Sequence, residues 1–201
     1  MKGKPNFEDL FSIMKSKDFL SMEGLGNEVP FFVHAYEPAV QDKVYEGIHN
    51  LLKRLETEGV EPLLIGLYDM VVEYLQENNE LDDTFDYEKS VPKEEFFKEM
   101  VHTFNADGVV KPYFKKKLNE ASHKMVILYQ VGEVFPFLRT HNVLNWLQSV
   151  VKDIPLIVFF PGEYITSLDE GFKLNLFGKF SGPYYRAFRL EDYAIRGVSH
   201  D

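Results

Sequence analysis

Hydrophobic positions along the chain follow two alternating patterns. Short apolar runs bounded by turn residues have the length and composition of buried strands, and they cover residues 30–36, 63–67, 125–129 and 155–160. Between these runs, apolar residues recur every three or four positions, as in helices with one buried face. The clearest such stripe consists of Val40, Val44, Ile48, Leu51, Leu52 and Leu55. A first helix is predicted after Asn6, which is placed to cap it.

Strands that alternate with helices favour an α/β fold with right-handed crossovers. We therefore expect a mostly parallel sheet flanked by helices on both faces, a P-loop or Rossmann-like three-layer architecture without a functional Walker motif. At 201 residues the chain is predicted to form one domain, residues 1–201. At its C-terminal end, residues 174–177 and 184–190 are expected to supply one or two further strands.

The segment from about 78 to 122 is predicted to be a helical insertion in this domain. Residues 77–88, ENNELDDTFDYE, are expected to form an acidic loop or linker at its start. Pro92 then opens a helix with its apolar residues on one side, and a further helix runs to about residue 122. The apolar side of the first of these helices consists of Phe96, Phe97, Met100, Val101 and Phe104.

The stretch 125–148 has the order of a nucleotide site: a buried strand, a glycine at its carboxyl end, and an amphipathic helix. Ligands of open α/β sheets bind there, against the N-terminus of the helix. Gly132, however, is followed by no second or third glycine and by no Lys-Ser/Thr pair. Glu133, at the expected helix N-terminus, complements the helix dipole without a ligand. Arg139 and His141 on this helix are the candidate anion-binding side chains.

Other catalytic patterns are also incomplete. Two Glu-x-x-His pairs, Glu46/His49 and Glu99/His102, have the spacing of di-iron bundle ligands. Helical wheels place both pairs opposite the apolar faces of their helices, so solvent-exposed positions are expected. There is no G-x-S-x-G nucleophile motif, and without cysteine there is no thiolate ligand or nucleophile. We expect no catalytic residue, no metal and no cofactor.

Charge and composition narrow the possible partners. The net charge of −10 argues against broad contact with a nucleic-acid backbone. Lys115–Lys117 is the only basic run, and it lies late in a predicted helix, where cations suit the dipole. No apolar run approaches the length of a membrane span, and no signal peptide is visible. Together with the absence of cysteine, these features predict a cytoplasmic protein.

Distinctive residues gather at four places next to predicted strands and on the helix after Gly132: residues 24–30, 136–141, 160–164 and 184–189. Turn chemistry and core packing explain them on one interpretation. On the other, they form a shared pocket or a docking surface rich in arginine and tyrosine. The candidate interaction or ligand-binding residues are Gly132, Arg139, His141, Glu163, Tyr184 and Arg186.

The same clusters resemble the BrxB family of BREX bacteriophage-defence systems. The matching pieces run in order along the chain: GLGNEVPFFV (24–33), VGEVFPFLRTHNVLNWLQ (131–148), FFPGEY (159–164), LFG (176–178) and YYRAFRL (184–190). The resemblance implies a cytoplasmic defence component with a large ATPase, a DNA adenine methyltransferase (PglX) and an alkaline-phosphatase-like protein (PglZ) as companions. It carries over no enzymatic activity and no catalytic residue.

The function expected from the sequence is that of a non-catalytic adaptor that binds other BREX proteins. PglZ is the first partner expected, followed by the ATPase and the methyltransferase. The alternative is a regulatory protein that binds a nucleotide or small ligand in the crevice near Gly132, Arg139, Pro161 and Glu163. Direct DNA binding and membrane association are not expected.

Overall fold

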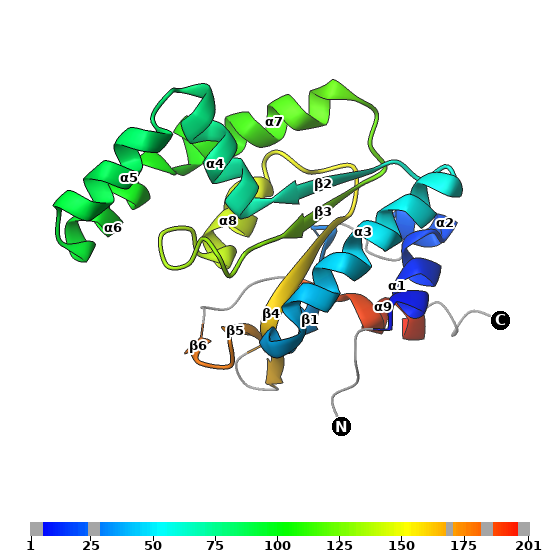
Figure 1. The fold of residues 1–201 in the computed structure, drawn as a ribbon. Coiled ribbons are helices and arrows are strands. Elements are labelled where there is room, and N and C mark those ends of the chain that lie inside the picture. The colour runs from blue at the N-terminus through cyan, green and yellow to red at the C-terminus, as the bar shows by residue number, and fades with distance from the viewer. Residues whose placement is uncertain (1–5, 24–28, 168–170, 182–186, 197–201) are drawn as a thin grey trace.

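The computed structural model describes residues 6–23, 29–167, 171–181 and 187–196. Parallel strands form the centre of the molecule in the order β2-β3-β4-β1-β7, with helices on both faces of the sheet (Figure 1). This arrangement confirms the predicted fold class. The parallel strands are β1 (Phe31–Tyr36), β2 (Pro62–Gly66), β3 (Met125–Tyr129), the first part of β4 (Leu156–Ser167) and β7 (Phe188–Arg189).

The central strands are buried on both faces, which is why their sequences are continuously apolar. In β4, Leu156, Val158 and Phe160 pack into one hydrophobic core, whereas Ile157 and Phe159 pack into the other. Because side chains alternate along a strand, one apolar run supplies both cores.

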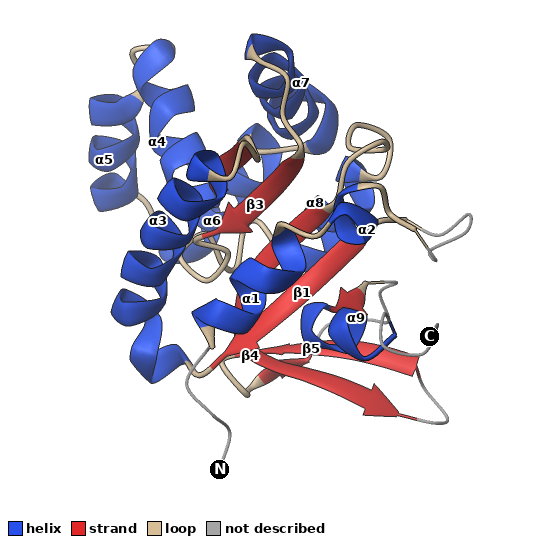
Figure 2. Ribbon diagram, turned by 90° about the vertical axis from the view of Figure 1, so that its right-hand side faces the viewer, coloured by secondary structure: helices blue, strands red, loops and turns tan. Residues whose placement is uncertain are grey.

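One core lies beneath α1 (Phe7–Met14), α2 (Lys17–Leu20), α3 (Gln41–Thr57) and α9 (Leu190–Arg196). Figure 2 shows α1 and α9 over β1 on the viewer's side of the sheet. Val44, Ile48, Leu51 and Leu55 of the predicted stripe form the buried face of α3, whereas Leu52 is half-buried and Val40 precedes the helix. The side chain of Asn6 caps α1 by accepting the Glu8 N–H at 3.2 Å, as predicted. The other core lies beneath α4 (Leu67–Glu77), α7 (Lys111–Glu120) and α8 (Thr140–Leu147).

Between β2 and β3 the chain is helical. After α4 come α5 (Leu81–Ser90), α6 (Lys93–Thr103), a π-helical turn (Ala106–Val110) and α7. The prediction of a loop over residues 77–88 was wrong, because α5 begins at Leu81. Two aspartates in its first turn and Lys89 in its last complement the helix dipole, so this polar segment is helical without a buried face. That residues 78–122 form an insertion in a single domain stays a prediction.

Two helix starts differ from the prediction. The helix after β3 begins at Thr140 rather than directly after Gly132, and turns occupy the intervening residues. Pro136 explains the delay, since it lacks the N–H that a helix interior needs and disfavours helical geometry at Phe135. The sequence also predicts Asp69 as the cap of the helix that carries Met70, Val71, Tyr74 and Leu75. Asp69 instead lies within the first turn of α4, because α4 starts at Leu67 after Gly66.

Strand β4 continues beyond Pro161-Gly162, where it was predicted to end. It runs to Ser167 and returns as β5 (Gly171–Leu176) and β6 (Phe180–Ser181), all antiparallel. We call this element, residues 160–181, the β4–β6 hairpin. The predicted strand over 184–190 is reduced to β7 in the described part, and α9 follows directly at Leu190.

No helix within the described residues combines the length and the apolar character that crossing a bilayer requires.

Candidate functional site

The crevice after β3 is occupied by the protein's own β4–β6 hairpin. A Cβ atom at Gly132 would lie 2.9 Å from the Phe177 ring and 3.2 Å from Cγ of Pro161, both of which belong to the hairpin. These distances are shorter than ordinary van der Waals contact. A larger residue at position 132 would therefore displace the Phe177 ring, which lies next to the place where a nucleotide phosphate would be sought.

The β3–α8 loop, the start of α8 and the hairpin line a small cavity of about 30 Å³, and Gly132 is not among its lining residues. This space suits one or two water molecules, whereas pockets for cofactors and other small molecules typically measure about 300–1,000 Å³. Its described lining residues are Phe135, Arg139, Thr140, His141, Phe160, Leu174, Leu176 and Phe180. Residues of the clusters at 136–141 and 160–164 thus meet at this cavity.

Arg139 is exposed at the residue preceding α8, rather than in the helix body as expected. Its guanidinium carbon lies 6.0 Å from the centre of the Phe135 ring, and that ring lies 4.8 Å from the ring of Phe180. Phe180 is 46% exposed. We call Phe135, Arg139 and Phe180 the Arg139 surface; arginine and exposed aromatic rings are side chains enriched at protein interfaces.

His141 lies beside this surface and is half-buried. Burial lowers the pKa of His141 below its usual value, and the positive charge of Arg139 lowers it further. The imidazole is consequently neutral at pH 7, which leaves Arg139 as the positive charge at the cavity.

The remaining predicted site residues do not join this group. Glu163 lies in β4, in register with Asn175 of β5. Phe160 and Tyr164 pack on the core side, so the alternation of side chains along the strand directs Glu163 to the opposite face. Tyr184 and Arg186 lie outside the described residues.

A polar network at the carboxyl ends of the strands was missed by sequence reasoning. The Tyr45 hydroxyl donates a hydrogen bond to Oε1 of Glu133 at 2.5 Å. The Tyr129 hydroxyl donates to Oδ2 of Asp69 at 3.1 Å, and the two tyrosine rings meet edge to face at 5.1 Å. We call Tyr45, Asp69, Tyr129 and Glu133 the tyrosine–carboxylate network.

Tyr45 and Tyr129 act as hydrogen-bond donors in this network, because both phenols stay protonated. Burial raises the pKa of Tyr129 to about 12, and the neighbouring Asp69 carboxylate acts in the same direction. Burial and Glu133 also raise the pKa of Tyr45. Both phenols keep their protons at neutral pH and are therefore suited to holding the strand ends together. The position of Tyr129 at the end of a buried run was a usable signal, whereas the approach of Tyr45 to Glu133 was not, since 88 residues separate them.

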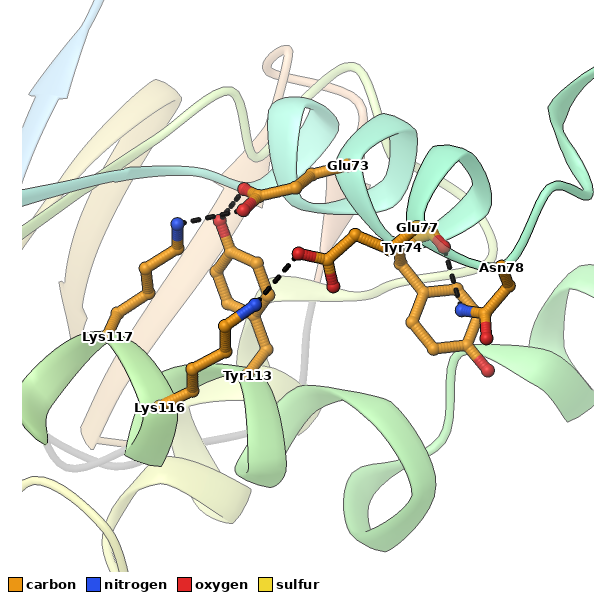
Figure 3. Close-up of polar contacts among 7 residues, drawn as sticks. All are labelled: Glu73, Tyr74, Glu77, Asn78, Tyr113, Lys116 and Lys117. Atoms are coloured by element: carbon orange, nitrogen blue, oxygen red, sulfur yellow. Dashed lines mark hydrogen bonds and ion pairs between the residues drawn. The ribbon is translucent and has the colours of Figure 1, made fainter. Parts of the chain in front are cut away.

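The single basic run is largely engaged within the protein (Figure 3). Nζ of Lys117 lies 2.8 Å from Oε1 of Glu73, and Nζ of Lys116 lies 2.8 Å from Oε1 of Glu77. Tyr113 also donates a hydrogen bond to Glu73, at 2.6 Å. Carboxylates of α4 thus compensate two of the three lysines that a nucleic-acid backbone would need.

Replacing Glu73 with glutamine should make the free energy of unfolding less sensitive to acidic pH. Burial alone would raise the pKa of Glu73, but hydrogen bonds from Lys117 and Tyr113 outweigh burial and hold the pKa below its usual value of 4.5. The carboxylate therefore stabilises the fold above pH 4.5 and loses this effect as the pH falls through its lowered pKa. In urea unfolding at pH 7, Glu73→Gln should cost about 1 kcal/mol, after allowance for solvent screening. The difference from wild type should shrink below pH 4.5.

Glu77→Gln is the matched control, because it breaks a more exposed pair on the same helix. Its effect at pH 7 should be smaller than that of Glu73→Gln. Equal losses, or a Glu73→Gln difference that persists at pH 3, would contradict the assigned role of Glu73.

Both Glu-x-x-His pairs are exposed, as the helical wheels predicted: Glu46, His49, Glu99 and His102 all lie on solvent-facing positions. Across the described ranges, histidine and carboxylate side chains form no group of three or more that could hold a metal ion.

Comparisons with known proteins identify similar chains. The family model described as "BREX protein BrxB" matches residues 63–190. A "BREX protein BrxB" of Bacillus cereus (strain H3081.97) is 32% identical over 191 residues, which cover 92% of this chain and 95% of that protein. One of Escherichia coli O9:H4 (strain HS) is 30% identical over 173 residues, covering 86% and 83%. No solved structure is significantly similar to the chain.

Proposed function

Because the chain belongs to the BrxB family, and so is a component of a BREX phage-defence system, we propose that it is a non-catalytic adaptor for other BREX proteins. PglZ is the first partner to test, followed by the ATPase and the methyltransferase, and the proposal includes a cytoplasmic location. The observation that carries it is the Arg139 surface, in which the exposed Arg139 and Phe180 both lie near the half-buried Phe135 ring. The neighbouring strand-end crevice is occupied by the hairpin.

The composition of this surface supports binding to a protein. Energetic hot spots of interfaces are enriched in arginine and large aromatic side chains that become buried in the complex. Phe180 is 46% exposed and Ile165, also in the hairpin, is 40% exposed. Burying such side chains against a partner contributes about 25 cal/mol per Å² of apolar surface.

The absence of catalysis is supported by the groups at the strand ends. Phe177 packs against Gly132, where a nucleotide phosphate would be sought. Tyr45 and Tyr129, whose pKa values are raised, keep their protons at neutral pH. His141 is neutral, so Arg139 is the one cation among the described residues that line the cavity. The cavity, at about 30 Å³, is too small for a substrate.

The alternative function, binding of a nucleotide or small ligand, is favoured by the presence of Arg139 and His141 at that cavity. Saturation at 100 times Kd would stabilise the protein by about 2.7 kcal/mol. We expect no rise in melting temperature with ATP or GTP at millimolar concentration. A rise that Arg139→Ala abolishes would support the alternative and contradict the filled crevice.

Arg139→Ala should weaken the complex with the BREX partner at least tenfold, a loss of about 1.4 kcal/mol. The test is co-expression of the chain with PglZ, the ATPase or the methyltransferase, followed by affinity capture and size-exclusion chromatography. The melting temperature of the variant should stay near that of wild type, since Arg139 is exposed.

Arg54→Ala is the control variant for this experiment. Arg54 is half-buried, pairs with Glu8 and also lies over an aromatic ring, at 4.0 Å from the centre of Phe11, but it belongs to α3 on the other face of the sheet. The complex should tolerate its loss. Elution of the wild-type chain alone from all three partners would overturn the adaptor function, and an unchanged complex with Arg139→Ala would remove the Arg139 surface from it.

A further inference from the structure

Helices α5 and α6 form a helical arm, residues 81–103, that projects away from the sheet beyond α4 (Figure 1). None of the ten residues of α5, all of them described, is buried, and Met100 is the buried residue of α6. Two consecutive helices with so little buried surface contribute little to the hydrophobic cores. The surface of the arm is therefore largely available for contact with another molecule.

The arm has the most concentrated charge of the chain. Residues 80–99 contain eight carboxylates and three lysines, which account for half of the formal net charge of −10. Two of the lysines are committed to neighbours within the arm, Lys89 to Asp86 at 2.9 Å and Lys98 to Glu94 at 2.9 Å. The local surface is therefore strongly negative.

A groove of about 490 Å³ lies between the end of α4, the two helices of the arm and the π-helical turn. Its wall includes the half-buried rings of Tyr74, Tyr87 and Phe96, and the Tyr87 and Phe96 rings lie 6.3 Å apart. The volume falls within the usual range for binding pockets. Unlike the cavity beside Arg139, this groove has room for large side chains.

Three exposed carboxylates, Glu80, Asp83 and Glu99, also line this groove. In the part of the chain that the structure describes, no lysine or arginine forms an ion pair with any of them. A groove that contains both carboxylates and aromatic rings can recognise a guanidinium group in two ways. The carboxylates accept paired N–H···O bonds from it, and the rings stack against the cation.

Apolar side chains of the arm also remain uncovered. Phe85 is 47% exposed, and Phe97 and Val101, one turn apart on α6, are 37% and 42% exposed. Exposed apolar positions combined with unpaired charge of one sign are typical of a surface that becomes covered in a complex.

We infer that the groove of the helical arm binds an arginine-containing basic segment of another BREX protein. This inference rests on the proposed adaptor function but uses a surface separate from Arg139. The negative charge of the arm would repel the phosphates of a nucleic acid, which is therefore not the occupant. A second copy of this chain fits poorly, because two of the three lysines in its basic run are paired with Glu73 and Glu77 and the run contains no arginine.

The test compares two triple variants of the full chain with equal changes in charge. The groove variant is Glu80→Gln, Asp83→Asn and Glu99→Gln. The matched control is Asp82→Asn, Asp86→Asn and Glu88→Gln, which removes three charges from the same arm at positions that do not line the groove. All six residues are exposed, so both proteins should fold, as circular dichroism and melting temperatures will show.

Binding is measured by fluorescence anisotropy with a labelled peptide, Leu-Arg-Arg-Leu-Leu-Arg-Arg-Leu, and with its Arg→Lys counterpart. We expect the groove variant to bind the arginine peptide at least tenfold more weakly than wild type, and the control to stay within threefold. Wild type should prefer the arginine peptide. Equal weakening in both variants would reduce the effect to general electrostatics and overturn the inference, as would an unchanged affinity of the groove variant.

A second measurement separates this inference from the adaptor function. The groove variant and Arg139→Ala are each co-expressed with the three BREX partners. Loss of a partner in the groove variant, but not in the charge-matched control, supports the groove. If no partner binds wild type, the adaptor function fails, whereas the peptide experiment still decides the chemistry of the groove.

Discussion

Replacing Phe160 with alanine is expected to lower the free energy of unfolding by about 3–5 kcal/mol. Phe160 lies in β4, between β3 and β1, and only 1% of its surface is exposed. The substitution removes apolar surface from the core beneath α8 and enlarges the small cavity that Phe160 lines. Because domains are stable by only about 5–15 kcal/mol, this loss is a large fraction of the total. Urea unfolding followed by circular dichroism measures it.

Phe97→Ala is the matched control. The sequence pattern placed Phe97 on the buried side of its helix, but the structure leaves it 37% exposed on the helical arm. Its removal should change the free energy of unfolding by about 0.5 kcal/mol or less. If Phe160→Ala cost less than 1 kcal/mol, or if Phe97→Ala cost as much, the assignment of core and arm would be wrong.

Gly162→Ala should destabilise the β4–β6 hairpin and open the crevice behind it. A Cβ atom at position 162 would lie 2.2 Å from the carbonyl oxygen of Asn175 and 3.0 Å from the amide nitrogen of Phe177. Both contacts are with backbone atoms of the hairpin, so no side-chain rotation relieves them. Overpacking of this kind costs about 1–3 kcal/mol. Hydrogen exchange of β5 amides should accelerate, and Phe177 should no longer be held against Gly132.

Gly178→Ala tests whether the effect comes from crowding. Gly178 belongs to the same hairpin and has a φ of +69°, but no atom lies within 4 Å of a Cβ at this position. The left-handed conformation alone should cost about 1 kcal/mol and leave exchange in β5 near the wild-type rate. Equal acceleration in both variants would show that the hairpin opens for another reason.

Most of the central sheet could be predicted from local patterns. Residues 125–129 are uniformly apolar, and β3 has these bounds. The stripe at Val44, Ile48, Leu51 and Leu55 was confirmed because each of these residues must reach the same core. Both cores are filled by β-strand residues of alternating orientation, so burial on two faces explains why periodicity sufficed there.

Local patterns failed where a distant segment decides the conformation. Strand β4 continues past Pro161 because β5 pairs with it through Gly162–Ser167. The sequence near Pro161 contains no signal that predicts this pairing. Residues 81–90 are helical although their composition suggested a loop, because charges at both ends suit the helix dipole. The exposure of Phe97 follows from the projection of the arm and could not be read from its spacing.

The candidate site shows the same division. Gly132, Arg139 and His141 could be selected from the sequence because they follow a buried strand. The ring of Phe177 could not be placed there, since 45 positions separate it from Gly132 and only the turn of the hairpin brings it back. The pairing of Glu133 with Tyr45 likewise depends on the packing of α3 beside β3.

The sequence by itself determined the α/β class, the four main strands and the motifs shared with the BrxB family, because hydrophobic periodicity and short motifs are local properties. Only the tertiary structure decided that the strand-end crevice is filled, that two lysines of the basic run are paired with α4, and that an acidic arm carries an open groove. Each of these depends on contacts between segments far apart in the chain, whose free energies no local pattern contains.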